Sequence, residues 1–206
     1  MKHELRIMVI VFIALFMIHN SLFITPVFAS DNDIGYSQIT PASPLYFLKG
    51  VREVLELKFA GTTRVKMLRQ LEFATRRLRE ARTLIRDQNE ELVPATLERY
   101  AAQFSELTDR HAKNDEVGIR IEESLVVHLN ALERLYNKAT SPRSKMFIRS
   151  SLNRLIQRAD VTNTSRAPIC QLFAKEASSS ALNQTEQVVL SDRAQKCFKS
   201  LVPGRV

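Results

Sequence analysis

Two cysteines near the C-terminus are the residues with the most definite chemistry in this sequence. Cys170 and Cys197 lie on two short segments with helical spacing of apolar residues. If these segments fold back on each other near residues 179–182, the cysteines come level near the open end of the hairpin. An oxidising compartment would join them, and closing a loop of this length is worth ~3.5 kcal/mol. The pattern predicts a disulfide-stapled hairpin over residues 168–206, with two free buried thiols as the alternative.

A row of arginines between residues 62 and 88 suggests a second kind of chemistry, which is the binding of anions. On a helical wheel these arginines fall opposite the apolar positions of the same segment. They could form an anion-binding face for phospholipid, wall polymer or an acidic protein. The alternative is a solvated face partly paired with Glu91, Glu98 and Glu106. The six residues are Arg64, Arg69, Arg76, Arg79, Arg82 and Arg86.

Two histidines occupy positions that the helical pattern otherwise gives to apolar residues. His111 and His128 could ligate a metal or titrate in the core. In one continuous helix they would lie ~25 Å apart, so a shared ion is disfavoured. A histidine bonded to a neighbour is the simpler interpretation. The sequence has no H-E-x-x-H, G-x-S-x-G or clustered Cys/His/Asp set, so we predict no enzyme, no metal and no cofactor.

Composition excludes several classes of protein. The chain has 206 residues, a net charge of +8, 45% hydrophobic residues, 5 glycines and no tryptophan. The apolar fraction excludes a disordered chain, and so few glycines disfavour a β-barrel or a P-loop enzyme. Aromatic residues are not interleaved with the arginines as in single-strand binders, so we predict no nucleic-acid partner.

The first 29 residues have the pattern of a targeting segment. A positively charged start is followed by the apolar run Ile7–Ile18 and then by small residues up to Ala29. This order is typical of a signal peptide cleaved between Ala29 and Ser30. The alternative is an uncleaved membrane anchor over residues 7–29. We therefore expect an exported protein, extracellular, periplasmic or at the cell surface, that meets a membrane only if this segment is retained.

The segment after the targeting region is expected to enter a first helix. Residues 30–42 lack a helical period and are expected to be extended. Ser43 and Pro44 form a cap-then-proline pair that predicts a helix start, and Gly61 predicts its end. Apolar residues follow at helical spacing within this segment. They are Leu48, Val51, Leu55 and Phe59.

Regular helical seams dominate the middle of the chain. A second helix is predicted from about Thr62 to Gln88, and its seam residues are spaced 4, 3, 4, 3 and 4 apart. The same phase runs through residues 94–139. The pattern there is consistent both with one long helix and with two helices. The seam residues of the second helix are Met67, Leu71, Ala74, Leu78, Ala81 and Ile85.

Two further helix starts and one linker are predicted toward the C-terminus. Ser141 and Pro142 repeat the cap-then-proline pattern. Residues 161–167 are polar and aperiodic, and they predict a linker that ends at Pro168. Asn183 with Glu186 three residues later resembles a capping box.

Two stretches of the chain carry a family resemblance. Residues 39–49 read ITPASPLYFLK, which fits an entry of the form T-P-x-S-P-L-Y-x-L-K. Residues 72–81 read EFATRRLREA, which fits an A-x-R-R-L-x-E-A helix. Over about residues 38–110 the chain resembles an uncharacterised bacterial family, the domain of unknown function 5667. The resemblance implies an exported or membrane-tethered helical domain, and it implies no activity and no functional residues.

These observations together predict an all-α protein. Residues 43–160 should form a helical bundle or an extended helical hairpin, followed by the linker and the stapled hairpin. The expected role is a non-catalytic structural or interaction module of the bacterial cell envelope, with a protein or an anionic surface as partner. The alternative is an envelope sensor or binding protein for an anionic ligand through the arginine face. A homo-oligomer stays open, because such seams can also pack between chains.

Overall fold

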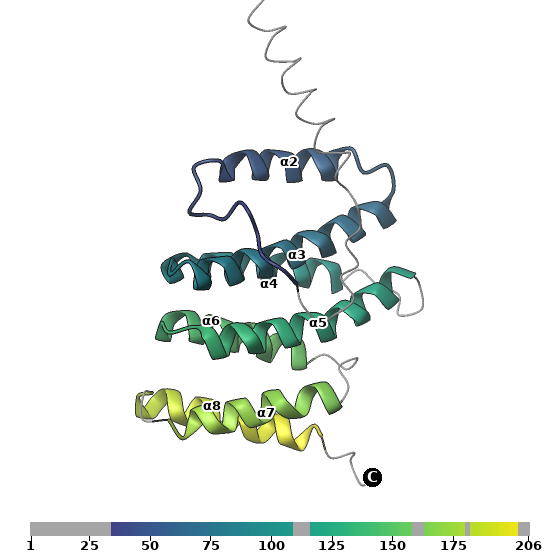
Figure 1. Cartoon of the computed structure of the whole chain (residues 1–206). Coiled ribbons are helices and arrows are strands. Elements are labelled where there is room, and N and C mark those ends of the chain that lie inside the picture. Colours follow the sequence, from purple (N-terminus) through teal and green to yellow (C-terminus); the bar gives the residue numbers. More distant parts are fainter. Residues whose placement is uncertain (1–33, 109–115, 158–162, 180–181, 202–206) are drawn as a thin grey trace, which may run out of the picture. The chain divides into compact units, whose positions relative to one another are not determined.

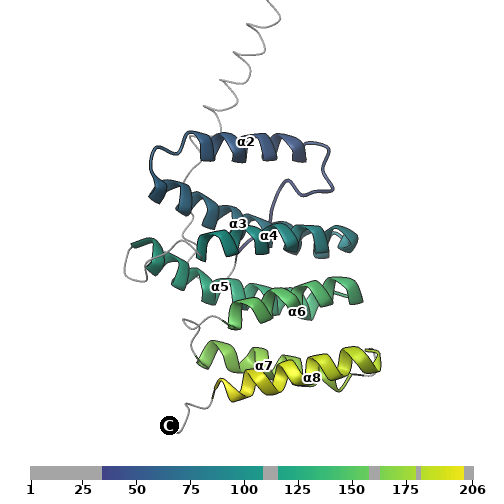
Figure 2. The same ribbon diagram turned by 180° about the vertical axis from the view of Figure 1, so that it is seen from behind.

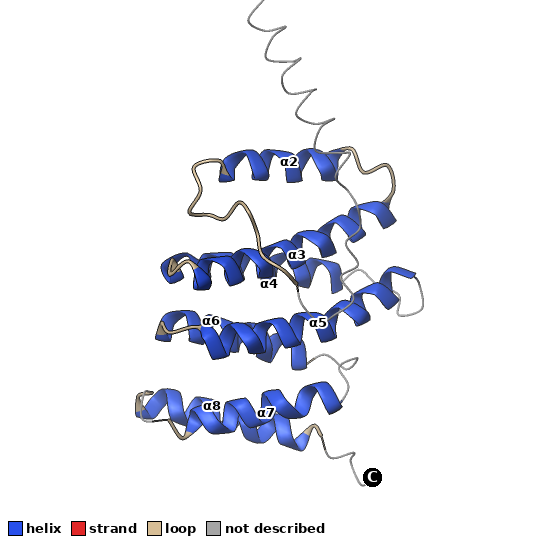
Figure 3. Ribbon diagram, in the orientation of Figure 1, coloured by secondary structure: helices blue, strands red, loops and turns tan. Residues whose placement is uncertain are grey.

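Every regular element of the described chain is a helix (Figure 3). The structure is a computed structural model that describes residues 34–108, 116–157, 163–179 and 182–201. The predicted signal peptide and its cleavage site lie outside these residues. The helices are α2 (Tyr46–Lys58), α3 (Thr63–Arg86), the short 3-10 helix η1 (Glu90–Leu92), α4 (Val93–Thr108), α5 (Glu116–Lys138), α6 (Pro142–Ile156), α7 (Asn163–Ala177) and α8 (Gln184–Lys199). The predicted all-α fold class is confirmed.

Successive helices pair as hairpins, and the hairpins stack in layers (Figures 1 and 2). Helix α3 pairs with α4, α5 with α6, and α7 with α8. Contacts of α3 with α5 and of α4 with α6 join the first two layers, and α7 contacts both α5 and α6. Each layer therefore contacts its neighbours in sequence, as in helical repeat stacks. Of the two architectures expected, this is a packed set of hairpins rather than one extended hairpin.

The stretch 94–139 contains two helices. Helix α4 ends at Thr108 and α5 begins at Glu116. Both helices pack on α3, so each needs an apolar face directed toward that helix. The shared phase therefore reflects two separate helices that both pack on α3, and not one continuous helix. His111 falls between the two helices and lies outside the described residues.

The predicted seam of α3 is the centre of the core. Its six residues are all buried, and they belong to one cluster with the apolar faces of α4, α5 and α6. Ala74, Leu78 and Ala81 have no exposed surface. Alanine at two of these positions lets a neighbouring helix approach closely, which accounts for the alternation of small and large residues.

Three helices begin at the capping residues that the sequence indicates. The Thr62 hydroxyl accepts the Val65 N–H at 3.2 Å, and α3 follows. Ser141 caps α6, with Pro142 in its first turn. Asn183 and Glu186 form the complete capping box of α8. Each cap satisfies backbone donors that the helix itself leaves unpaired.

The predicted start of the first helix, with Ser43 as its cap, is two residues too early, since the residue before the helix is Leu45. The Ser43 carbonyl accepts the Tyr46 N–H at 3.0 Å, and its hydroxyl accepts the Leu45 N–H at 3.3 Å. Ser43 therefore sits in a turn, and α2 starts at Tyr46 without a side-chain cap. The helix ends at Lys58, and Gly61 lies in the connection to α3.

The predicted linker over residues 161–167 is also wrong for most of its length. Helix α7 starts at Asn163, so Pro168 lies inside the helix and not at its beginning. The polar residues have a structural role here, because Arg166 is buried and donates to the Ser200 carbonyl at the end of α8 at 3.5 Å. The polar composition of this segment is therefore compatible with a helix, because its polar side chains can bind a neighbouring segment of the chain.

Candidate functional site

The two family-like stretches meet in space at the contact between α2 and α3. The Tyr46 hydroxyl donates to Glu80 Oε2 at 3.0 Å, and Lys49 Nζ lies 2.6 Å from Glu80 Oε1. Arg77 Nη1 donates to the Tyr46 oxygen at 2.8 Å and to Glu80 Oε1 at 2.5 Å. Tyr46 and Lys49 come from the first stretch, and Arg77 and Glu80 come from the second. The resemblance therefore marks one polar cluster that attaches α2 to α3.

Burial changes the electrostatics of this polar cluster. Glu53 of α2 is buried and pairs with Arg77. Desolvation raises the pKa of Glu53, with Arg77 acting in the opposite direction. Desolvation also lowers the pKa of Lys49 and raises the pKa of Tyr46. Removing a single partner would leave a buried charge without compensation, which is far costlier than losing an exposed ion pair.

Helix α2 is oriented with its polar face inward. Tyr46, Lys49, Glu53 and Glu56 recur at helical spacing, and all four contact α3. The opposite face holds the apolar residues Phe47, Leu48, Val51 and Val54, and all are exposed. This is the reverse of the usual arrangement, in which a helix buries its apolar stripe.

The outer face of α2 is therefore an exposed apolar surface. Val54 is 65% exposed and Phe59, just after the helix, is 75% exposed. In both views, no described helix lies on the outer side of α2 (Figures 1 and 2). We call this surface the α2 outer face, and it comprises Leu45, Phe47, Leu48, Val51, Val54 and Phe59. Contiguous apolar surface of this kind marks interaction sites.

The predicted arginine row is largely covered by the chain that precedes α3. Arg76 pairs with Glu56 of α2 at 3.4 Å and with Glu72 of its own helix at 2.7 Å. Arg69 pairs with Glu72 at 3.1 Å. Burial opposes ionisation of Glu72, but these two arginines hold its pKa below the usual value. The acidic partners of Arg69 and Arg76 lie on α2 and α3, whereas the sequence interpretation placed the partners of the row on the next helix.

The lead-in before α2 covers Arg79, Arg82 and Arg86 of the arginine row. Arg79 donates to the Ile34 carbonyl at 2.5 Å, and Arg82 donates to the Gly35 carbonyl at 3.4 Å. The guanidinium groups of Arg82 and Arg86 lie over the Tyr36 ring, at 4.1 and 4.5 Å from its centroid. Arg64 lies exposed in the first turn of α3. The row therefore serves mainly as the surface on which residues 34–58 pack.

His128 is a fully structural histidine. It is buried between Thr75 Oγ1, at 2.9 Å from Nε2, and the Tyr100 hydroxyl, at 3.2 Å from Nδ1. Desolvation, with a smaller effect of Arg79, lowers the pKa of His128 to about 3. The ring is therefore neutral near pH 7. This agrees with the interpretation of a histidine bonded to its neighbours.

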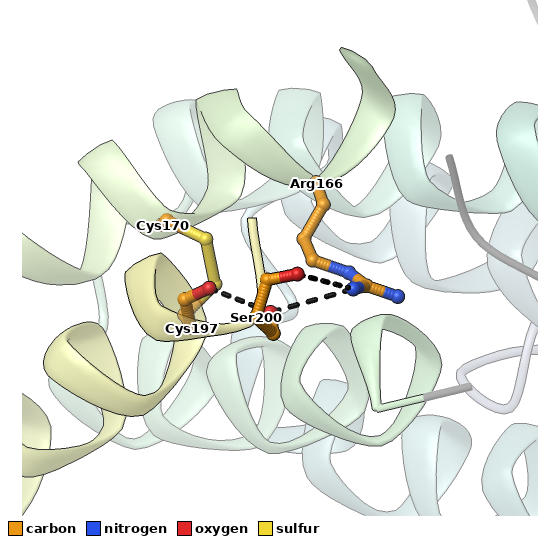
Figure 4. The surroundings of a disulfide bond; sticks show 4 residues. All are labelled: Arg166, Cys170, Cys197 and Ser200. Carbon is orange, nitrogen blue, oxygen red and sulfur yellow. Dashed lines mark hydrogen bonds between the residues drawn. A yellow bond between two sulfur atoms is a disulfide. The ribbon is translucent and has the colours of Figure 1, made fainter. Parts of the chain in front are cut away.

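The predicted disulfide joins α7 and α8. Cys170 and Cys197 are bonded with their Cα atoms 5.4 Å apart, and the alternative of two free thiols is wrong. Arg166 on α7 donates to the Ser200 hydroxyl at 3.3 Å, and that hydroxyl donates to the Cys197 carbonyl at 2.6 Å (Figure 4). The covalent bond and these polar contacts close the open end of the hairpin together.

The described residues contain neither a metal-ligating cluster nor a membrane-spanning helix. No group of three or more His, Cys, Asp or Glu residues among them is placed to hold a metal ion. None of the described helices combines the length and the apolar character needed to cross a bilayer.

Comparison with known proteins identifies the family. The model of the domain of unknown function 5667 matches residues 38–142, about half of the chain. The chain belongs to this family. The match extends beyond residue 110, the limit of the resemblance seen in the sequence, and ends at the first residue of α6. No curated protein and no solved structure matches the chain.

Sequence reasoning missed the residues of the α2–α3 polar cluster. Tyr46 and Lys49 were considered only as parts of the first family-like stretch and Glu80 only as part of the second, and Glu53 was not singled out. Their spacing of three and four residues on α2 was the available signal, since it places them on one stripe. The stripe was overlooked because the apolar stripe on the same helix has the same period.

Proposed function

We propose that this chain is an exported, non-catalytic interaction module of the bacterial cell envelope, and that the α2 outer face is its docking surface. The observation that carries the proposal is the orientation of α2. The α2–α3 polar cluster fixes the helix with Phe47, Val51 and Val54 turned to solvent. Exposure of these apolar side chains contributes nothing to the protein's own stability, because apolar burial is the main favourable term in folding. Docking of the α2 outer face on a partner would bury these side chains and recover that favourable free energy.

Two further observations support export. The order of residues up to Ala29 suits a signal peptide, and the disulfide suits an oxidising compartment. Mass spectrometry of the protein from its native host tests this part. A mass that corresponds to a chain beginning at Ser30 would support cleavage. A full-length mass would instead indicate a retained membrane anchor.

The arginine row favours the first function over the alternative of an anion sensor. Arg76 and Arg79 already bind Glu56, Glu72 and the Ile34 carbonyl. An anionic ligand would have to displace these partners to reach the row. The α2 outer face requires no such rearrangement.

Site-specific photo-crosslinking in the native host tests the docking surface. A benzophenone side chain replacing Val54 should form an adduct in intact cells, seen as a mass increase of the purified chain. The matched control replaces Val126, a valine on α5 that is 38% exposed. No adduct at position 54, or equal adducts at both positions, would contradict the proposal.

A further inference from the structure

The exposed surface around α2 has a distinctive charge pattern. Between Ala42 and Lys66 the exposed residues include no carboxylate. Glu53 and Glu56, which are the acids of this stretch, both face α3. The exposed charges are all cationic and gather where α2 connects to α3. They are Lys58, Arg64 and Lys66.

Apolar side chains continue into this cationic region. Phe59 lies beside Lys58, and Val65 lies between Arg64 and Lys66 and is also exposed. Aliphatic and aromatic residues next to lysine and arginine, without acids, are the composition of helices that lie in the interface of an anionic bilayer. We propose that the α2 outer face docks on the surface of an anionic lipid bilayer, an inference that rests on the proposed function and names its partner.

The shape of the surface favours a bilayer over a folded protein. Helix α2 has 13 residues, so its outer face is a single convex ridge ~20 Å long. Folded proteins that bind one helix commonly receive its apolar face in a groove. A fluid bilayer needs no complementary groove and takes up a single convex helix.

The inward polar face of α2 is already satisfied by protein groups and needs no contact with water. In an isolated interfacial helix, the polar face contacts water. In this chain, Lys49, Glu53 and Tyr46 satisfy their polar groups on α3 instead. The stacked helices thus take the place of water, and they hold α2 as a preformed apolar ridge. Preformation lowers the conformational cost of docking.

A single tryptophan tests the inference, because the natural chain contains none. The full chain carrying Val54→Trp is mixed with vesicles of phosphatidylglycerol and phosphatidylcholine in equal amounts. We expect its emission to shift to shorter wavelength and to be quenched by brominated acyl chains. The matched control is Val126→Trp, at a position one turn from the exposed Glu122 and Glu123, which should show neither effect. The comparison holds even if the N-terminal segment brings both variants to the vesicle.

The contributions of charge and of apolar burial to docking on the vesicle should be separable. Vesicles of phosphatidylcholine alone, or added salt, should weaken the response of the Val54→Trp variant, since cationic contacts to anionic lipid are screened. Adding Val51→Asp should weaken the apparent affinity about tenfold or more, because it removes one buried valine from the docked face. Val126→Asp should leave the affinity unchanged.

Four results would overturn the inference, and they treat the proposed function differently. A shift of the Val54→Trp emission that needs no lipid and grows with protein concentration would identify a second copy as the partner. An unshifted emission with protein adducts at position 54 in cells would identify a protein partner. In both cases the proposed function would stand. An emission of the Val54→Trp variant that is shifted without lipid at all protein concentrations would mean that the chain covers its own α2 outer face. An emission that lipid does not shift, together with no adduct at position 54 in cells, would mean that nothing docks there. Either result would end both proposals.

Discussion

The Tyr46 hydroxyl of α2 and the Glu80 carboxylate of α3 form a hydrogen bond of 3.0 Å. Arg77 and Arg99 both donate to the same hydroxyl oxygen, at 2.8 and 3.0 Å. One phenol thus connects α2 to both helices of the first hairpin. This bond explains how a helix can be held by its polar side while its apolar side faces outward.

Replacing Tyr46 should release α2 without unfolding the core. Tyr46→Phe removes a donor to Glu80 and an acceptor of Arg77, at a cost of about 1–3 kcal/mol for groups left unsatisfied. Helix α2 makes few contacts beyond its polar face, so the loss should appear as faster amide exchange in α2 alone. Hydrogen exchange resolved by residue measures this.

A matched tyrosine provides the control for that variant. Tyr36 is exposed and contacts arginines through its ring, so Tyr36→Phe keeps the contacts. Exchange in α2 should stay unchanged in this control. Equal exchange in α2 for Tyr46→Phe and the natural protein would show that the hydroxyl does not hold the helix.

His128 should make the protein less stable in acid. The unfolded chain binds a proton at this histidine below about pH 6.5, whereas the folded chain does so only near its pKa of about 3. Between these values the unfolded state holds more protons, so the free energy of unfolding falls as the pH falls, by up to about 1.4 kcal/mol per pH unit.

Urea unfolding between pH 7 and pH 4 measures this dependence. His128→Gln keeps hydrogen-bonding capacity toward Thr75 and Tyr100 but does not titrate. The difference in stability between the natural protein and the variant should shrink or reverse as the pH falls, because only the natural protein loses the histidine contribution. A difference that is constant with pH would contradict a neutral, desolvated His128.

Removing the disulfide should destabilise the third hairpin. The double variant Cys170→Ser with Cys197→Ser frees the loop between α7 and α8, which should lower the free energy of unfolding by ~3.5 kcal/mol. Urea unfolding of this variant and of the reduced natural protein should give similar losses. The two sulfur atoms are bonded to each other, so the cysteines of the natural protein in denaturant should alkylate only after reduction. Alkylation of the denatured, unreduced protein would rule out the bond in solution.

The elements that could be predicted are those that depend on local signals. The seam of α3, the caps at Ser141 and Asn183, and the cysteine pair each carry a pattern that is complete within a few residues. The linker was predicted wrongly because its outcome depends on a distant partner, since Arg166 binds Ser200 from 34 residues away. The start of α2 was predicted wrongly because a local turn competes with the helix there, and the bonds of Ser43 to Leu45 and Tyr46 belong to that turn.

The candidate site was less predictable than the fold. A helical period shows that α2 has a polar and an apolar stripe, but it does not show which stripe faces inward. That choice follows from Arg77 and Glu80, which present buried charges to the underside of α2. The same tertiary contacts explain why the arginine row resembled an open anion-binding face when only the sequence was considered.

The most direct test of the account is the solvent exposure of position 54 without lipid. Single-tryptophan variants Val54→Trp and Val126→Trp can be compared by emission wavelength and by acrylamide quenching at low protein concentration. If α2 is held by its polar face, the tryptophan at position 54 should emit at long wavelength and be quenched at least as readily as the one at position 126. A short-wavelength emission from position 54 that acrylamide quenches poorly would show that the apolar face packs inward, and the account of α2 would be wrong.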